Sequence, residues 1–475
     1  MGPAKTDIAV IGAGISGLCA AHWLKKPGFK VRVLEKDSEP GGTMKTLRRQ
    51  GFLIETGPNS ALETTPLIGE LMADLGLANE FLYANPAGKN RYILRDGVLR
   101  ALPLSPFAFL TTRLFSVGAK FRLLKEPFIG RADKEESIAE FVTRRLGREF
   151  LDYAIDPFVA GVFAAKPDVL SVRSAFPKLY ALEERYGGLI RGMLLGRSER
   201  SKRSEKAKDR AESFSFRRGM QEFPHALARG LGDAVEFDSK VSAIRDLARS
   251  TTETEDEPGA KRYEIEYLKN DHLETIEADA IVLAVPAETA AMLIQPFSPT
   301  VAHRLRSIHY PPVASVFAGF KRGQIPNALN GFGFLIPSRE QRSILGCLWS
   351  SSLFPDRAPA DCAALTVFVG GGRQPDLANK SEEELVALVC EELESIMHIQ
   401  GKPLYWNVTK WRRAIPQYEL GYQGILDQLA DFETEHPGMF FCSNYRGGIS
   451  VGDCVRSASA TAEVVQAHIR RSSAR

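Results

Sequence analysis

The feature that most constrains the fold is the segment DIAVIGAGISG at residues 7–17, followed by VRVLEK at residues 31–36. Gly12, Gly14 and Gly17 stand at the G-x-G-x-x-G spacing between an apolar strand pattern and an alanine-rich helix pattern. The first glycine permits a tight turn, the second lets a pyrophosphate approach the backbone, and the third lets the helix pack on the strand. Free N–H groups at the helix N-terminus then bind phosphate. The segment therefore predicts a doubly wound, Rossmann-like dinucleotide-binding fold.

The residues after this segment narrow the choice of dinucleotide. Glu35 ends the second strand, where an acid binds ribose hydroxyls and disfavours the 2′-phosphate of NADP. NAD and FAD remain. Gly41 and Gly42 follow Pro40, and paired glycines would let the backbone close on a second phosphate or a ribityl chain. An ordinary Pro-Gly turn explains the same residues, so the local sequence leaves both interpretations open.

Composition sets outer limits. A chain of 475 residues that is 44% hydrophobic and 25% charged is long enough for two or three domains. A net charge of +3 is too small to indicate a nucleic-acid partner. The six cysteines have neither C-x-x-C nor metal-ligand spacing, which predicts free thiols and no metal site. Residues 1–6 lack an apolar core and no apolar run approaches the ~20 residues of a spanning helix, so we expect a cytoplasmic protein that is soluble or membrane-peripheral.

The nucleotide-binding start is separated along the chain from other segments of the same kind. Residues 280–285 (AIVLAV) predict a strand buried on both faces, and residues 439–456 predict a strand, a glycine turn and the start of a helix over 451–469. Short alternating strands with glycine turns between residues 301 and 416 predict an antiparallel sheet. The expected divisions are 1–90, 213–300 and 417–475 for the cofactor domain, 91–212 for a helical insert with a substrate- or membrane-facing part, and 301–416 for a substrate-binding sheet.

The insert combines bulky apolar and basic residues. Residues 102–130 fit either a membrane interface or an amphipathic helix pair packed on its own domain, and both remain open. Residues 197–210 form a mixed-charge run that predicts a solvated loop, with contact to anionic lipid as the alternative. Residues 138–150 predict a helix with three exposed arginines, Arg144, Arg145 and Arg148.

Several motifs carry a family resemblance. FLIETGP at residues 52–58, placed after the glycine doublet, resembles flavin amine oxidases, carotenoid desaturases and protoporphyrinogen oxidases, which favours FAD. Many members carry an arginine beside the doublet, whereas this chain has Thr43, Met44 and Lys45. Five further segments are similar to the oxygen-dependent protoporphyrinogen oxidases, and the resemblance runs from residue 7 to about residue 465: KNRY at 89–92, AGVFA at 160–164, LSVRSAFP at 170–177, WSSSLFPDR at 349–357 and YRGGISVGD at 445–453.

The resemblance implies an activity. It implies non-covalent FAD and oxidation of protoporphyrinogen IX to protoporphyrin IX for heme biosynthesis, with O2 as acceptor and H2O2 as product. Coproporphyrinogen III is the alternative substrate, and an amine oxidase, a carotenoid desaturase or a non-enzymatic flavin scaffold are the alternative functions. The resemblance also implies peripheral contact with a membrane, an organellar inner membrane in a eukaryote, and leaves a homodimer open.

The resemblance also assigns residues. Arg91 would pair a propionate, unless it is a surface arginine, and the backbone of Gly161 would lie against the macrocycle, unless that glycine only ends a helix. Trp349 would stack on the macrocycle or belong to the core. No acid or base is assigned, because the one candidate, His309, is better explained as structural. Cofactor contacts are expected at Gly12, Gly14, Ile15, Ser16, Gly17, Glu35, Lys36, Gly41, Gly42, Thr43, Gly57, Pro58, Val241 (adenine) and Val451 (pyrimidine end), with Asp453 either touching flavin or capping its helix.

Overall fold

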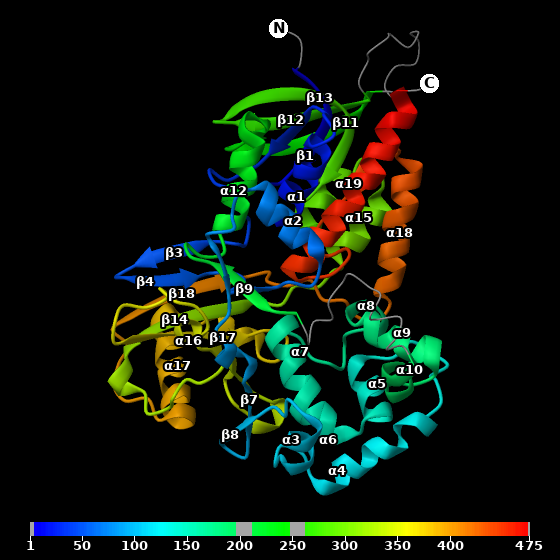
Figure 1. Ribbon diagram of the computed structural model, residues 1–475. Coiled ribbons are helices and arrows are strands. Elements are labelled where there is room, and N and C mark those ends of the chain that lie inside the picture. The colour runs from blue at the N-terminus through cyan, green and yellow to red at the C-terminus, as the bar shows by residue number, and fades with distance from the viewer. Residues whose placement is uncertain (1–3, 196–210, 248–261, 474–475) are drawn as a thin grey trace.

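Two seven-stranded sheets organise the chain, and a group of helices lies beside the second sheet (Figure 1). This computed structural model describes residues 4–195, 211–247 and 262–473. The charged run at 197–210 lies outside these ranges. No helix within them is long and apolar enough to cross a membrane.

The first sheet is built from three separated stretches of the chain. Its order is β10-β2-β1-β13-β12-β11, and β19 pairs with the end of β13. The strands β2, β1, the second half of β13 and β19 run parallel, as a dinucleotide-binding sheet requires. The bounds are Ala4–Ile11 (β1), Val31–Leu34 (β2), Val235–Glu236 (β10), Ser239–Asp246 (β11), Tyr263–Lys269 (β12), His272–Leu283 (β13) and Met439–Phe441 (β19).

Helices cover both faces of this sheet. On one face, α1 (Ile15–Lys25), α12 (Glu222–Leu231) and α19 (Val451–Ser473) bury a core that includes Leu18, Leu24 and Val455. On the other face lie α14 (Ala287–Ile294), α15 (Pro299–Arg306) and α18 (Tyr422–Glu435). The expected strand at 280–285 is confirmed, but β13 begins eight residues earlier because its first half pairs antiparallel with β12.

The second sheet confirms the antiparallel prediction and adds strands to it. Its order is β18-β14-β17-β16-β15-β7-β8, with α17 (Glu382–Met397) packed on one face. β7 and β8 come from residues 91–101, which were expected to be helical; they join here because β7 pairs parallel with β15. The bounds are Arg91–Arg95 (β7), Val98–Ala101 (β8), Val313–Lys321 (β14), Gly333–Leu335 (β15), Ile344–Leu348 (β16), Cys362–Gly370 (β17) and Tyr405–Trp411 (β18).

Short strands join the two large sheets. β3 (Thr46–Arg49) and β4 (Phe52–Glu55) form a hairpin, and β9 (Ser213–Phe216) pairs with β5 (Ala61–Leu62) and β6 (Phe81–Tyr83). β4 leads directly into the expected cofactor segment Gly57–Pro58.

The helical group is held by a buried ion network. Arg145, at the end of α5 (Ile138–Arg145), is fully buried between Glu126 and Glu183 at 3.1 and 2.7 Å, so the expectation that it is exposed is wrong. Glu126 also accepts the N–H groups of Leu189 and Ile190. Burying a charge requires partners of this kind, and single-sequence periodicity does not reveal them. The other helices are α3 (Pro106–Thr111), α4 (Val117–Arg122), η2 (Leu123–Phe128), α6 (Arg148–Phe150), η3 (Leu151–Ile155), α7 (Asp156–Phe163), α8 (Val172–Ala175), α9 (Pro177–Tyr186) and α10 (Leu189–Leu195).

Candidate cofactor and substrate site

The carboxyl ends of the parallel strands meet at one edge of the first sheet. The N–H of Gly12 donates to the Leu34 carbonyl at 2.8 Å, and the N–H of Ala284 donates to that of Ile11 at 2.9 Å. Gly12 has φ +100°, and a Cβ there would lie 2.7 Å from the Ala284 carbonyl oxygen. Only glycine fits this turn, in agreement with the predicted role of the first glycine.

The glycine doublet, Gly41 and Gly42, packs against the turn that contains Gly12 and Gly14. The N–H of Gly41 donates to the Ala13 carbonyl at 2.9 Å, and a Cβ on Gly42 would lie 3.6 Å from the Cα of Gly14. A Cβ on Gly14 itself meets nothing within 4 Å. By contrast, a Cβ on Gly17 would lie 2.0 Å from the carbonyl oxygen of Gly12, so Gly17 serves helix–strand packing. Backbone from two segments thus surrounds open space at the start of α1, beside Ile15 and Ser16.

Glu35 closes one end of this edge. Its buried carboxylate accepts the N–H of Ala13 at 2.6 Å and that of Asp37 at 3.0 Å. The Glu35 carbonyl accepts the N–H of Ser239 at 2.7 Å, which places the start of β11 and the buried Val241 close by. The exposed Lys36 side chain pairs with Asp37 at 2.8 Å, and its contact with the cofactor stays a prediction.

The segment around Gly57 and Pro58 packs on the doublet. A Cβ on Gly57 would lie 1.9 Å from the Thr43 carbonyl oxygen. The Thr56 carbonyl accepts the indole N–H of Trp411 from β18 at 2.8 Å, so the second sheet also holds this segment.

The C-terminal glycine turn reaches the same place. The Cys442 thiol lies 3.9 Å from the Ser16 carbonyl oxygen, after β19 and beside the first turn of α1. The turn then leads to Val451, the first residue of α19. The N–H of Asp453 donates to the Ser450 hydroxyl at 3.2 Å, and that hydroxyl donates to the Asp453 carboxylate at 2.6 Å. Ser450 therefore caps α19 and the Asp453 carboxylate supports that cap, while a contact of Asp453 with flavin stays a prediction.

These contacts test whether the site fits an elongated dinucleotide. In the first turn of α19, Cys454 lies near enough to Cys19 of α1 to add to the effect of burial in raising the pKa of that thiol, and Gln466, further along α19, donates to the Trp23 carbonyl at 3.1 Å. The two helices therefore run in the same direction, and both N-termini face the carboxyl edge of the sheet. Glycine backbone, an acid for ribose and two helix N-termini follow one another along this edge. This donor set fits two phosphates and a ribose.

Arg91 lies on the second sheet, where β7 meets β15. It pairs in register with Gly333, and its guanidinium lies 5.2 Å from the ring centre of Phe332. The side chain is exposed, yet the protein around it lowers its pKa by desolvation. Over residues 4–195, 211–247 and 262–473 it has no carboxylate partner within ion-pair distance. An unpaired guanidinium in partly desolvated surroundings is suited to an anionic ligand.

Gly161 lies across the same strand. It is an exposed residue inside α7, which ends at Phe163, so it does not end the helix. A Cβ on Gly161 would lie 2.4 Å from a methyl group of Leu335, two residues along β15 from the register partner of Arg91. The structure therefore brings Arg91 and Gly161 to one short strand. Leu335 was not predicted, because nothing local distinguishes it from other strand leucines.

Of the two roles considered for Trp349, the structure favours the core. It is 1% exposed and packs on Tyr92 and Phe334, with ring centres 5.4 and 6.4 Å away. Side chains of neighbouring strand residues alternate between faces, so Tyr92 and Phe334 lie on the opposite face from Arg91 and Leu335. Trp349 belongs to the core under α17, and it offers no free face to a ligand.

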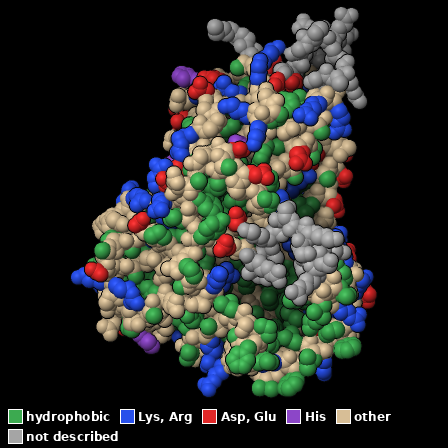
Figure 2. Space-filling model, in the orientation of Figure 1, with side chains coloured by type: hydrophobic (Ala, Val, Ile, Leu, Met, Phe, Trp, Pro, Cys, Tyr) green, Lys and Arg blue, Asp and Glu red, His purple; other side chains and the backbone are tan. Residues whose placement is uncertain are grey.

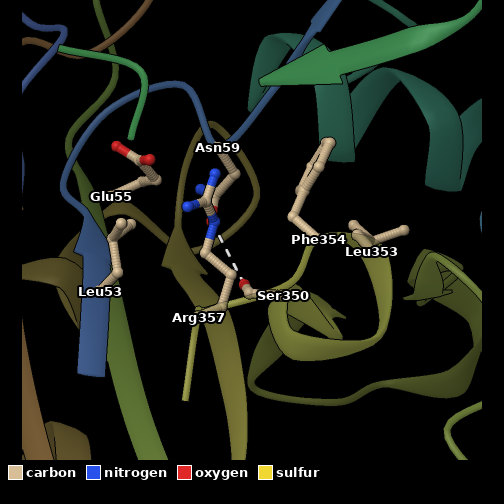
Figure 3. Close-up of a pocket in the computed structure, with 7 residues that line it drawn as sticks. All are labelled: Leu53, Glu55, Asn59, Ser350, Leu353, Phe354 and Arg357. Atoms are coloured by element: carbon tan, nitrogen blue, oxygen red, sulfur yellow. Dashed lines mark hydrogen bonds between the residues drawn. The ribbon is translucent and has the colours of Figure 1, made fainter. Parts of the chain in front are cut away.

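A small cavity, lined by polar and apolar side chains, lies between β4 and residues 350–357 (Figure 3). The volume of this cavity is about 10 Å³, which is too small for an organic ligand. Arg357 is 2% exposed and donates to the Ser215 hydroxyl at 2.7 Å and to the Phe216 carbonyl at 3.0 Å. The seven lining residues are Leu53, Glu55, Asn59, Ser350, Leu353, Phe354 and Arg357.

Glu55 is the titratable group of this cavity. Burial raises its pKa to about 7, although the Thr46 hydroxyl at 2.7 Å, the charge of Arg357 and the Met220 N–H at 2.9 Å each favour the ionised form. Sequence reasoning noticed Glu55 only as part of a motif, because its partners lie far along the chain. His309, the one residue considered as an acid or base, forms an exposed pair with Glu419 at 3.2 Å, in agreement with a structural role.

Comparisons with known proteins agree with this geometry. The family described as flavin containing amine oxidoreductase matches residues 15–466. Protoporphyrinogen oxidase 2, chloroplastic/mitochondrial, of Arabidopsis thaliana is 35% identical over 97% of this chain and 94% of its own length. Coproporphyrinogen III oxidase of Bacillus subtilis (strain 168) is 28% identical over 96% of this chain and 97% of its own length.

Solved structures show the same fold. A crystal structure of a protein from Exiguobacterium sp. 255-15 has a TM-score of 0.78 at 22% identity, covering 98% of this chain and 100% of that one. Cyclohexylamine oxidase from Brevibacterium oxydans IH-35A has a TM-score of 0.66 at 17% identity, covering 98% and 99%. The chain therefore belongs to the flavin-containing amine oxidoreductase family, in its protoporphyrinogen oxidase group, and is an oxidoreductase that binds FAD.

Proposed function

We propose that the chain oxidises protoporphyrinogen IX to protoporphyrin IX in heme biosynthesis. Six hydrogens leave the macrocycle in three two-electron steps, and three molecules of O2 become three of H2O2. FAD supplies the hydride-accepting chemistry. The protein residues bind and orient the substrate, and pyrrole N–H protons leave without a dedicated side-chain base.

The observation that carries this proposal is the position of Arg91. Its guanidinium has no carboxylate partner among the described residues, and it lies beside Phe332 at the edge of β7. A propionate would fill that vacancy by a bidentate, charge-assisted contact. Gly161 of α7 and Leu335 of β15, which lie against each other, would then lie beside one face of the macrocycle.

Coproporphyrinogen III is the second candidate, favoured by the similarity to the Bacillus subtilis enzyme. It carries four carboxylates rather than two, so it needs more cationic partners than Arg91 alone. Initial rates of porphyrin fluorescence with each porphyrinogen and of ammonia release with a primary amine, all with FAD and O2 present, separate the candidates. We expect protoporphyrinogen to react fastest. Faster turnover of coproporphyrinogen would reverse the substrate assignment, and ammonia release from the amine alone would reject porphyrinogen oxidation.

We also propose that α3, α4 and η2 contact a membrane surface. Leu114 and Phe115 anchor this segment in the protein core, whereas Phe107 and Phe128 are 76% and 84% exposed. Figure 2 shows hydrophobic side chains gathered at this end of the molecule. The large apolar side chains exposed here are Leu104, Phe107, Leu110, Val117, Phe121, Leu124 and Phe128.

The composition of this surface suits an interface rather than a packed helix pair. Exposed Arg113 and Lys125 lie among the apolar side chains, where they would meet lipid headgroups. Flotation with phosphatidylcholine–phosphatidylglycerol vesicles tests this. We expect the triple variant Phe107→Ser, Phe121→Ser, Phe128→Ser to stay unbound and Leu273→Ser, an exposed leucine on β13, to float like the wild type. Equal flotation of both variants would reject the assignment.

A further inference from the structure

Two stacked tyrosines lie under the C-terminal glycine turn and are used by no step above. The rings of Tyr418 and Tyr422 are 4.4 Å apart at an angle of 21°, and both are buried. Tyr422 is the first residue of α18, and Tyr418 lies in the loop before it. Stacked aromatic rings in a core have few alternative rotamers, so their hydroxyls are fixed in position.

Both hydroxyls bind the backbone of the glycine turn. Tyr418 donates to the Asn444 carbonyl at 2.6 Å and accepts the N–H of Gly448 at 3.1 Å. Tyr422 donates to the Tyr445 carbonyl at 2.7 Å. The three backbone groups span residues 444–448, so the two side chains hold this turn by hydrogen bonds at three points.

The turn needs such support because its own backbone is unusual. Gly447 and Gly448 have φ +90° and +121°, a region that most residues avoid. Glycine also loses the most conformational freedom on folding, so a glycine pair without external hydrogen bonds would sample many conformations. A polar group buried beside the turn without its partner would cost free energy as well.

The residues that flank this turn contact segments of the cofactor edge on both sides. On one side, Cys442 meets the Ser16 carbonyl in the first turn of α1. On the other, a Cβ on Gly452 would lie 2.5 Å from the Thr64 hydroxyl, in the segment that follows Gly57 and Pro58. The conformation of residues 444–448 therefore sets where the N-terminus of α19 faces that edge.

We infer that Tyr418 and Tyr422 act as positioning residues for FAD: their hydroxyls fix the glycine turn in the conformation that presents the N-terminus of α19 to the flavin end of the cofactor. The inference rests on FAD binding and deepens the proposed function. It does not depend on which porphyrinogen is oxidised. Neither tyrosine touches the reacting atoms.

The test compares hydroxyl deletions in one core. Tyr418→Phe removes both bonds of Tyr418 and keeps the stacked ring. Tyr263→Phe is the matched control: Tyr263 is buried in the same hydrophobic cluster, and its hydroxyl donates to the Pro437 carbonyl at 2.8 Å, outside the turn. FAD dissociation constants are measured by flavin fluorescence on reconstituted apoprotein, together with the flavin absorption spectrum, the midpoint potential and the melting temperature.

We expect Tyr418→Phe to weaken FAD binding about five- to tenfold, as the loss of one to two hydrogen bonds predicts, and to shift the flavin spectrum. Tyr263→Phe should lower the melting temperature about as much as Tyr418→Phe does, because each variant loses a buried hydroxyl. It should leave the FAD affinity within about twofold of the wild type. If Tyr418→Phe does not fold, Tyr422→Phe replaces it, with a smaller loss in the same direction.

Two results would overturn the inference: wild-type FAD affinity and spectrum in both hydroxyl variants, or equal weakening of FAD binding by Tyr263→Phe. Its failure is separable from that of the proposed function. A wild-type protein that binds FAD but leaves every porphyrinogen unchanged would reject the reaction and leave the tyrosine comparison intact.

Discussion

Glu55 gives a prediction whose size follows from the structure. It is the last residue of β4 and lines the cavity of Figure 3, and burial raises its pKa from 4.5 to about 7. The charged groups that act on it are Arg357 and Arg48, and the Thr46 hydroxyl and Met220 N–H bind its oxygens. These groups offset only part of the desolvation cost of a buried carboxylate.

The sign of the pH effect follows from the direction of this shift. A carboxyl with a higher pKa in the folded than in the unfolded protein binds protons more tightly when folded. The folded state is therefore favoured at low pH, and that advantage is lost as the pH rises from about 4.5 to about 7. At about 1.4 kcal/mol per pKa unit the full effect is about 3 kcal/mol, of which about 2 kcal/mol falls between pH 5.5 and 8.5.

Glu55→Gln removes the ionisable group and keeps an acceptor for Met220. With saturating FAD, urea unfolding of both proteins at pH 5.5 and 8.5 gives the free energies of unfolding. We expect the variant to gain about 2 kcal/mol relative to the wild type over this range, because other titrating groups cancel in the difference.

Glu140→Gln is the control for this experiment. The backbone N–H of Ser137 lowers the pKa of Glu140, which therefore stays ionised throughout the range. Its difference from the wild type should not depend on pH. Parallel stability curves for Glu55→Gln and the wild type would refute the reasoning, because Glu55 would then titrate with an ordinary pKa.

Three further variants test the site. Arg91→Ala should raise the Michaelis constant for the porphyrinogen about 10- to 100-fold and change the turnover number little, since a charge pair remote from the reacting carbon is lost; steady-state kinetics with an unchanged Michaelis constant would count against it. Gly161→Leu should keep FAD and lose turnover, because its side chain enters the space beside Leu335; full activity would remove Gly161 from the substrate wall. Gly17→Ala should weaken FAD binding at least tenfold in a fluorescence titration, because its Cβ would lie 2.0 Å from the Gly12 carbonyl oxygen; Gly69→Ala, with nothing within 4 Å, is the control, and equal affinities in the two variants would contradict the packing role.

The features that the sequence predicts well are local. Gly12, Gly14 and Gly17 lie within one turn and the helix that follows it, and the contact of Gly17 with the Gly12 carbonyl spans only five residues. The contact between Gly42 and Gly14 is longer in range and was not predicted, because the doublet was expected only to lie near the cofactor. The discontinuous first sheet was predicted because buried parallel strands are continuous apolar runs, as in β13.

The features that were missed depend on distant pairing. Trp349 was left between a stacking role and the core, because a large aromatic side chain suits both, and only its packing on Tyr92 and Phe334 decides between them. Arg145 was predicted to be exposed because its ion-pair partners, Glu126 and Glu183, lie far from it in the sequence. The bond from Arg357 to Ser215 joins residues far apart in the chain, so no local pattern indicates the cavity beside Glu55.

The central claim is that bound FAD takes hydrogen from a porphyrinogen. Anaerobic titration of the FAD-loaded protein with protoporphyrinogen IX tests it most directly, with flavin absorbance and porphyrin fluorescence followed together. The proposal predicts bleaching of the flavin, with three flavins reduced for each porphyrin formed and the yellow colour restored by air. An oxidised flavin spectrum that persists with excess protoporphyrinogen would contradict the claim.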